Sequence, residues 1–125
     1  MKELPRISEA EWDVMSVVWA HEPVTAQEVH QHLVGQRDWN QRTVKTLIGR
    51  LVKKGVLEFE EDGKRYLYSA RVAREACVRA ENRSFVDRVH GGEASPMLAY
   101  FLRHSQLSKA EIDELKRLLD AKEAK

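Results

Sequence analysis

The side chains best suited to binding chemistry gather between residues 36 and 54, where six basic residues accompany a single acid in a chain of net charge only +1. Guanidinium and ammonium groups neutralise phosphates, and both can bond the O6 and N7 atoms of guanine. A threonine among them, Thr46, has a methyl group that can pack on a thymine methyl. This composition is typical of a surface that binds a polyanion.

No comparable set of residues indicates catalysis. The sequence has no phosphate-cradling glycine loop, no nucleophile elbow and no carboxylate pair with a reason for a perturbed pKa. His30 and His32 are two positions apart on an expected helix and point in nearly opposite directions, so they cannot share a metal ion. Cys77 lies among alanines, which favours a small core residue over a redox switch. We therefore expect neither an enzyme nor a bound metal or cofactor.

A helix must present the basic side chains. Apolar residues recur with a helical period between an N-cap residue, Asn40, and a glycine that can end the helix, Gly55. These apolar residues are Val44, Leu47, Ile48, Leu51 and Val52. The opposite face has no acid and consists of Arg42, Thr46, Gly49 and Lys53, flanked by Lys45 and Arg50. Because glycine costs about 1 kcal/mol inside a helix, Gly49 suggests that another body approaches this face closely.

The surrounding elements give this helix its context. Two capping-box sequences, Ser8 to Glu11 and Thr25 to Glu28, start two helices before it. The first helix should bury Trp12 and Trp19 in its apolar stripe. Residues 56–69 then alternate around a tight turn at Asp62-Gly63, which predicts a β-hairpin. Three helices followed by a hairpin is the order of a winged helix-turn-helix domain, which we place at residues 1–70.

Residues 71–125 are expected to be helical, with a helix from about Val72 to Gly91, another that Ser95 caps before Pro96, and a third after a capping box at Ser108. A unit this small has too little interior for its apolar surface, so we expect it to pair with an identical copy. The expected dimerisation residues are Phe85, Val89, Met97, Leu98, Phe101, Leu102, Ile112, Leu115 and Leu119. The fold class is thus mainly α with a small β-hairpin wing, formed by a winged helix and a C-terminal three-helix dimerisation unit.

The pattern assigns roles on double-stranded DNA. The residues expected to read bases are Arg42, Lys45, Thr46 and Gly49. Those expected to contact phosphates are Arg50, Lys53, Lys54 and, on the wing, Lys64 and Arg65. Three acids at the wing tip give the wing a secondary role. Two alternatives stay open, a winged-helix module that binds an acidic protein instead of DNA, and a repressor that a small effector releases.

The location of the protein follows from its hydropathy. No run approaches the roughly 18 to 20 apolar residues of a membrane span, and the first residues have no apolar signal core. We expect a cytoplasmic protein.

Two blocks, ISEAEWDVM at residues 7–15 and RTVKTLIGRLVKKG at residues 42–55, resemble the penicillinase-repressor family, and the resemblance extends over essentially the whole chain. Further matching positions are Trp19, Thr25-Ala26, Asp38-Trp39, Leu107-Ser108 and Glu111-Ile112. The resemblance implies a homodimeric winged-helix repressor, as in the regulation of β-lactam resistance, on an inverted-repeat operator with TACA/TGTA-type half-sites.

The resemblance also implies how such a repressor is released. A membrane-bound sensor metallopeptidase that has met a β-lactam triggers a cut at an Asn-Phe bond in the first helix of the dimerisation half. The matching bond here is Ser84-Phe85, where serine replaces asparagine. The copper-responsive branch of the family has a cysteine-rich C-terminal tail, which this chain, with Cys77 as its one cysteine, lacks.

Overall fold

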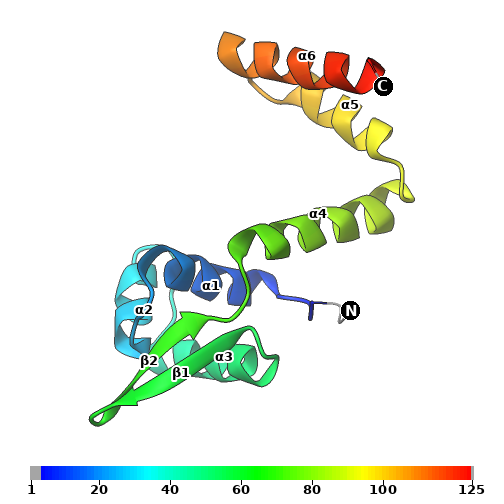
Figure 1. Ribbon diagram of the computed structural model, residues 1–125. Coiled ribbons are helices and arrows are strands. Elements are labelled where there is room, and N and C mark those ends of the chain that lie inside the picture. Colours follow the sequence, from blue (N-terminus) through cyan, green and yellow to red (C-terminus); the bar gives the residue numbers. More distant parts are fainter. Residues whose placement is uncertain (1–3, 125) are drawn as a thin grey trace. The chain divides into compact units, whose positions relative to one another are not determined.

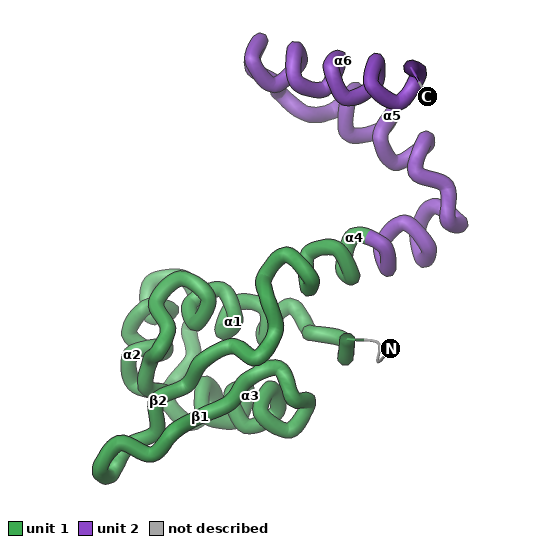
Figure 2. Tube along the Cα trace, in the orientation of Figure 1, with its two compact units in different colours: residues 1–82 green, residues 83–125 purple. Residues whose placement is uncertain are grey.

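The computed structural model describes residues 4–124, which form six helices and a two-stranded hairpin (Figure 1). In chain order these are α1 (Glu9–His21), α2 (Ala26–Leu33), α3 (Gln41–Lys53), β1 (Leu57–Asp62), β2 (Arg65–Ala70), α4 (Arg74–His90), α5 (Ala94–His104) and α6 (Lys109–Glu123). The expected fold class, mainly α with a hairpin wing, is confirmed. The chain divides into two compact units, Met1–Asn82 and Arg83–Lys125 (Figure 2).

The first three helices pack around one hydrophobic core. Its fully buried members come from all three helices and from the start of β1, and they include Val14, Met15, Val18, Val29, Leu33, Val44, Ile48, Leu51 and Leu57. Burying one aliphatic side chain of this size contributes about 1.5 to 3 kcal/mol, so this core fixes how the three helices lie against one another.

Both expected capping boxes at the start of α1 and α2 are present. Ser8 Oγ accepts a hydrogen bond from the amide of Glu11 (3.1 Å), and the Glu11 carboxylate accepts one from the amide of Ser8 (2.8 Å). Thr25 and Glu28 make the same reciprocal pair at 3.1 and 2.8 Å. Each box satisfies amides that the first helical turn leaves without a partner.

The ends of α3 are also as expected. Asn40 Oδ1 accepts a hydrogen bond from the amide of Thr43 (2.9 Å). At the other end Gly55 has φ +83°, and the amides of Gly55 and Val56 donate to the carbonyls of Val52 (3.0 Å) and Leu51 (3.1 Å). This pair of bonds is a Schellman motif, which requires a residue with positive φ at the position of Gly55.

The hairpin is antiparallel, with a register that runs from Leu57 opposite Ala70 to Asp62 opposite Arg65. Its two turn residues are Gly63, with φ +69°, and Lys64, one position later than expected. Val24 adds a short third element, because its amide donates to the carbonyl of Tyr68 (3.0 Å) and its carbonyl accepts from the amide of Tyr68 (2.7 Å). The sequence did not predict this bridge, since a single paired residue leaves no alternating pattern.

The buried stripe of α1 differs from the expected one. Trp12 and Trp19 are only half-buried, and Val14 and Val17 lie in the core beside Met15. The two indole rings pack edge to face with centroids 5.4 Å apart. Trp19 Nε1 donates to the carbonyl of Val72 (3.0 Å), so this ring lies against the segment that follows the wing. A polar indole nitrogen takes a partner at the edge of a core more readily than inside it.

The division between the two compact units lies within α4, whereas the expected functional domains, residues 1–70 and 71–125, stay a prediction. Cys77, in the first half of α4, is buried in the same hydrophobic cluster as α1, α2 and α3, and burial raises the pKa of its thiol. The second unit begins at Arg83. The sequence placed the domain boundary earlier because the hairpin pattern ends near Ser69 and a new helical pattern begins at about Val72.

The start of α5 also differs. Glu93 occupies the N-cap position and makes no side-chain capping bond, so Ser95 and Pro96 lie in the first helical turn. Pro96 is tolerated there because amides of the first turn have no intrahelical partner. Within residues 4–124 no helix is long and apolar enough to cross a membrane.

Candidate nucleic-acid interface

The outer face of α3 is exposed and positively charged. It carries the side chains of Arg42, Lys45, Thr46, Arg50 and Lys53, and α3 contains no acid. Among the residues that the structure describes, none of its four cations Arg42, Lys45, Arg50 and Lys53 forms an ion pair. These charges are therefore available to an external anion.

Two neutral residues lie among these cations. The Thr46 hydroxyl donates to the carbonyl of Arg42 (3.0 Å), so its hydrogen-bonding capacity is partly used within the helix and its methyl group is the natural contact group. At Gly49, an added Cβ would meet no atom within 4 Å. The protein itself therefore gives no packing reason for a glycine at this position.

Lys54 departs from the role expected of it. Its Nζ lies 2.5 Å from Oε1 of Glu11, which is 1% exposed, and 2.8 Å from the carbonyl oxygen of Arg6. Burial by itself raises the pKa of Glu11, but hydrogen bonds from Lys54 and Ser8 outweigh it, and the pKa of this carboxyl lies below its ordinary value. Lys54 thus fastens the end of α3 to the start of α1, and we no longer count it among the phosphate contacts.

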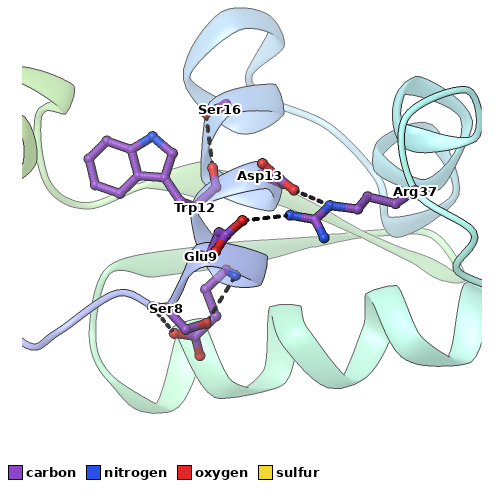
Figure 3. Close-up of polar contacts among 7 residues, drawn as sticks. Ser8, Glu9, Trp12, Asp13, Ser16 and Arg37 are labelled. Carbon is purple, nitrogen blue, oxygen red and sulfur yellow. Dashed lines mark hydrogen bonds and ion pairs between the residues drawn. The ribbon is translucent and has the colours of Figure 1, made fainter.

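Arg37 fastens the other end of α3 through the preceding loop. Its Nε lies 2.5 Å from Asp13 Oδ2, and a terminal nitrogen lies 3.6 Å from Glu9 (Figure 3). The same guanidinium lies 5.0 Å from the centroid of the Trp39 ring, and the Trp39 carbonyl is 2.9 Å from His30 Nε2. Sequence reasoning counted Arg37 as one more basic residue, because its acidic partners lie 24 and 28 positions earlier in the chain.

His32, two positions after His30 on α2, stacks on His21 with ring centroids 4.1 Å apart. His30 and His32 thus have different surroundings, as their spacing on one helix predicts.

A groove of about 460 Å³ lies between the wing and the first turns of α2 and α3. It brings together three of the expected DNA-contacting residues, Lys45 from α3 and the wing residues Lys64 and Arg65. Its other lining residues are Thr25, Ala26, Gln27, Gln41, Tyr66 and Tyr68. The Arg65 guanidinium also contacts Asp62 Oδ2 at 3.0 and 3.2 Å, so part of its charge is compensated within the wing.

Aromatic residues stiffen the wing. The ring of Phe59 lies 4.7 Å from that of Tyr66 and 6.0 Å from that of Tyr68, between centroids. A two-stranded hairpin is marginally stable alone, and cross-strand aromatic pairs contribute roughly 0.2 to 1 kcal/mol each. The wing can therefore hold Lys64 and Arg65 in place beside α3.

The expected dimerisation residues all lie in the second unit and none is buried there. Several are large and widely exposed, among them Val89 (56%), Leu98 (48%) and Leu119 (59%). The rings of Phe85 and Phe101 lie near each other within this unit, with centroids 6.4 Å apart. Apolar surface of this extent on helices is typical of an interface with another chain.

The bond expected to be cleaved, Ser84-Phe85, lies inside α4. Both residues are half-buried, and Ser84 Oγ accepts a hydrogen bond from Arg88 Nε at 3.1 Å.

Three helices, a hairpin wing and an acid-free basic face on the third helix define a DNA-binding protein of the winged-helix class. The penicillinase repressor family model matches residues 7–121. The penicillinase repressor of Bacillus licheniformis is 34% identical over 120 residues, covering 96% of this chain and 94% of its own. The methicillin resistance regulatory protein MecI of Mammaliicoccus sciuri is 33% identical over 116 residues, covering 93% and 94%.

A solved structure shows a similar likeness. The solution structure of monomeric Bacillus licheniformis BlaI in complex with a half-operator is 34% identical, with a TM-score of 0.53, and the match covers 61% of this chain and 93% of that one. This chain belongs to the penicillinase repressor family, whose members are transcriptional repressors and not enzymes.

Proposed function

We propose that this repressor acts in the cytoplasm as a homodimer on an inverted-repeat operator with TACA/TGTA-type half-sites, one winged helix on each half-site. The observation that carries the proposal is the outer face of α3, where four exposed cations have no acidic partner among residues 4–124 while the two cations that flank the helix, Arg37 and Lys54, pair with α1. The fold thus holds α3 with one set of charges and leaves the other set free.

On this surface the residues divide by the chemistry of their side chains. Arg42 and Lys45 read guanine edges, Thr46 packs its methyl group on thymine, and Gly49 allows the duplex to approach. The phosphate contacts are Arg50 and Lys53 on α3 and Lys64 and Arg65 on the wing, which shares a groove with Lys45. The half-operator in the related BlaI structure supports this use of the winged helix.

The second unit supplies dimerisation through its exposed apolar residues. Two half-site contacts on one dimer make the second contact intramolecular, with an effective concentration that can reach the mM range. Cleavage at Ser84-Phe85, after a signal from a membrane-bound sensor metallopeptidase, would separate the winged helix from these residues and end cooperative binding. The switch therefore need not touch the DNA-binding face.

The salt dependence of operator binding tests the DNA-binding part of the proposal. If each subunit neutralises about three or four phosphates, log K against log salt falls with a slope of about −5 to −7 for the dimer. Lys53→Ala should make that slope less negative by about 2, since each subunit loses one contact. Lys116→Ala, an exposed lysine on α6, serves as the matched control and should leave the slope unchanged. A slope near zero for the native protein would favour an acidic protein partner instead of DNA.

A further inference from the structure

The first residue of α3, Gln41, has a side chain that the assignments above leave unused. It is exposed and lines the groove beside Lys45, four positions further along the same side of the helix. Within the described part of the chain its amide forms no hydrogen bond, whereas the neighbouring Asn40 uses its side-chain oxygen to cap Thr43. Gln41 is therefore the amide at this end of α3 that is free for an external partner.

A free side-chain amide at the start of α3 can recognise one particular base. The N-terminal residues of a recognition helix are those that contact base edges in the major groove. A glutamine carbonyl can accept from N6 of adenine while its NH₂ group donates to N7, and no other base offers this pair of partners at one edge. Lys45, Lys64 and Arg65 around the same groove attract the phosphate backbone but do not distinguish adenine.

We propose that Gln41 is a specificity-determining residue that reads an adenine of the half-site. The inference rests on the proposed function, because it requires α3 to lie in the major groove. It extends that function, since the cations of the α3 face account for guanine and phosphate and leave the adenines of a TACA/TGTA-type half-site unread.

The test uses the full-length protein and a TACA/TGTA inverted repeat in which each adenine is replaced in turn by 7-deaza-adenine, which keeps base pairing but lacks N7. The native protein should lose roughly tenfold in affinity at one adenine of each half-site. Gln41→Ala should bind the unmodified operator about tenfold more weakly and lose its sensitivity to that one replacement. Gln41→Glu, which can accept but not donate, should shift the preference at that position from adenine to cytosine.

Gln31→Ala provides the matched control, because Gln31 is an exposed glutamine of α2 outside the groove, and it should behave as the native protein. Thermal melting of each variant checks the fold. An equal loss on operator and random DNA, with sensitivity to 7-deaza-adenine retained, would make Gln41 a backbone contact and overturn the inference. Unchanged binding by Gln41→Ala would overturn it as well. Operator preference in the native protein separates both outcomes from failure of the proposed function, in which that preference is absent.

Discussion

At the scale of single residues, two adjacent lysines at the end of α3 differ in whether they pair with an acid of the protein. Lys53 is exposed, whereas Lys54 pairs with the buried carboxylate of Glu11. Replacing Lys54 by Met leaves that carboxylate buried without its cation, and we expect a loss of about 2 kcal/mol in unfolding free energy. Lys53→Met should change stability by less than about 0.5 kcal/mol but weaken operator binding. Urea denaturation and binding titrations measure the two effects.

Because both lysines are adjacent in sequence, each variant controls for the other. The double variant Glu11→Gln/Lys54→Met should recover part of the stability lost in Lys54→Met, since no uncompensated charge stays buried. If instead Lys54→Met keeps full stability and loses DNA affinity, the ion pair is unimportant and Lys54 is a phosphate contact.

Glu11 also makes stability depend on pH. Its pKa in the folded protein lies below the ordinary value of 4.5, so it contributes stability that is fully present above about 4.5 and is lost as the pH falls through the folded pKa. Unfolding free energy measured between pH 6 and pH 3 should decline less steeply in Glu11→Gln than in the native protein. The remaining decline reflects Glu28 and Glu111, whose pKa values are also lowered, chiefly by hydrogen bonds from the backbone amides of Thr25 and Ser108. If the unfolding free energy falls with pH equally in Glu11→Gln and in the native protein, Glu11 does not contribute to the pH dependence of stability.

Gly49 allows a further test at this scale. An added Cβ meets open space, and alanine is the better helix former by about 1 kcal/mol, so Gly49→Ala should raise the unfolding free energy by up to that amount. Chemical denaturation measures it. The same variant should bind operator more weakly if the duplex approaches the helix at this point. Lower stability would mean that the backbone at Gly49 depends on glycine for a reason that its surroundings do not show.

At the scale of the element, we expect different residues of α3 to read bases and to bind phosphates. Arg42→Ala should cost about 1 to 3 kcal/mol on operator and relax sequence preference, whereas Arg50→Ala should weaken operator and random DNA alike. Competition titrations with both DNAs give the ratio of affinities for each variant. Equal losses on the two DNAs for Arg42→Ala would place Arg42 on the backbone.

The loop before α3 is held in place by contacts with α1 and α2. Arg37, held by Asp13 and stacked over Trp39, and His30, bonded to the Trp39 carbonyl, fix the chain just before the N-cap residue Asn40. A side chain placed to reach a base edge depends on such support, since small displacements lengthen its hydrogen bonds.

At the scale of the whole molecule, the two units should separate in function. A fragment of residues 1–84 retains the hydrophobic core of the first unit, including Cys77, but lacks the exposed apolar residues of α5 and α6. We expect it to melt cooperatively, to be monomeric by light scattering, and to bind operator about two to four orders of magnitude more weakly than the full chain. A fragment that dimerises, or that binds within a few-fold of the full chain, would place dimerisation in the first unit and remove the basis for release by cleavage.

Most of the architecture is determined by local sequence. Capping boxes, the apolar period of α3, the Schellman glycine Gly55 and the alternation in the hairpin are short-range signals, and the structure has each of them. The composition of the α3 face predicted a basic surface for the same reason, since residues three and four apart on a helix share a side.

Only the tertiary structure decided which charges are free. Lys54 and Glu11 are 43 positions apart and Arg37 and Asp13 are 24 apart, so no periodicity links them. Each pair removes one cation from the six between residues 36 and 54. The Val24 bridge, the placement of Cys77 in the first core and the groove that joins Gln41 and Lys45 to the wing are likewise contacts between distant segments. Such contacts depend on how the helices pack, because side chains that meet across a core need no regular spacing along the chain.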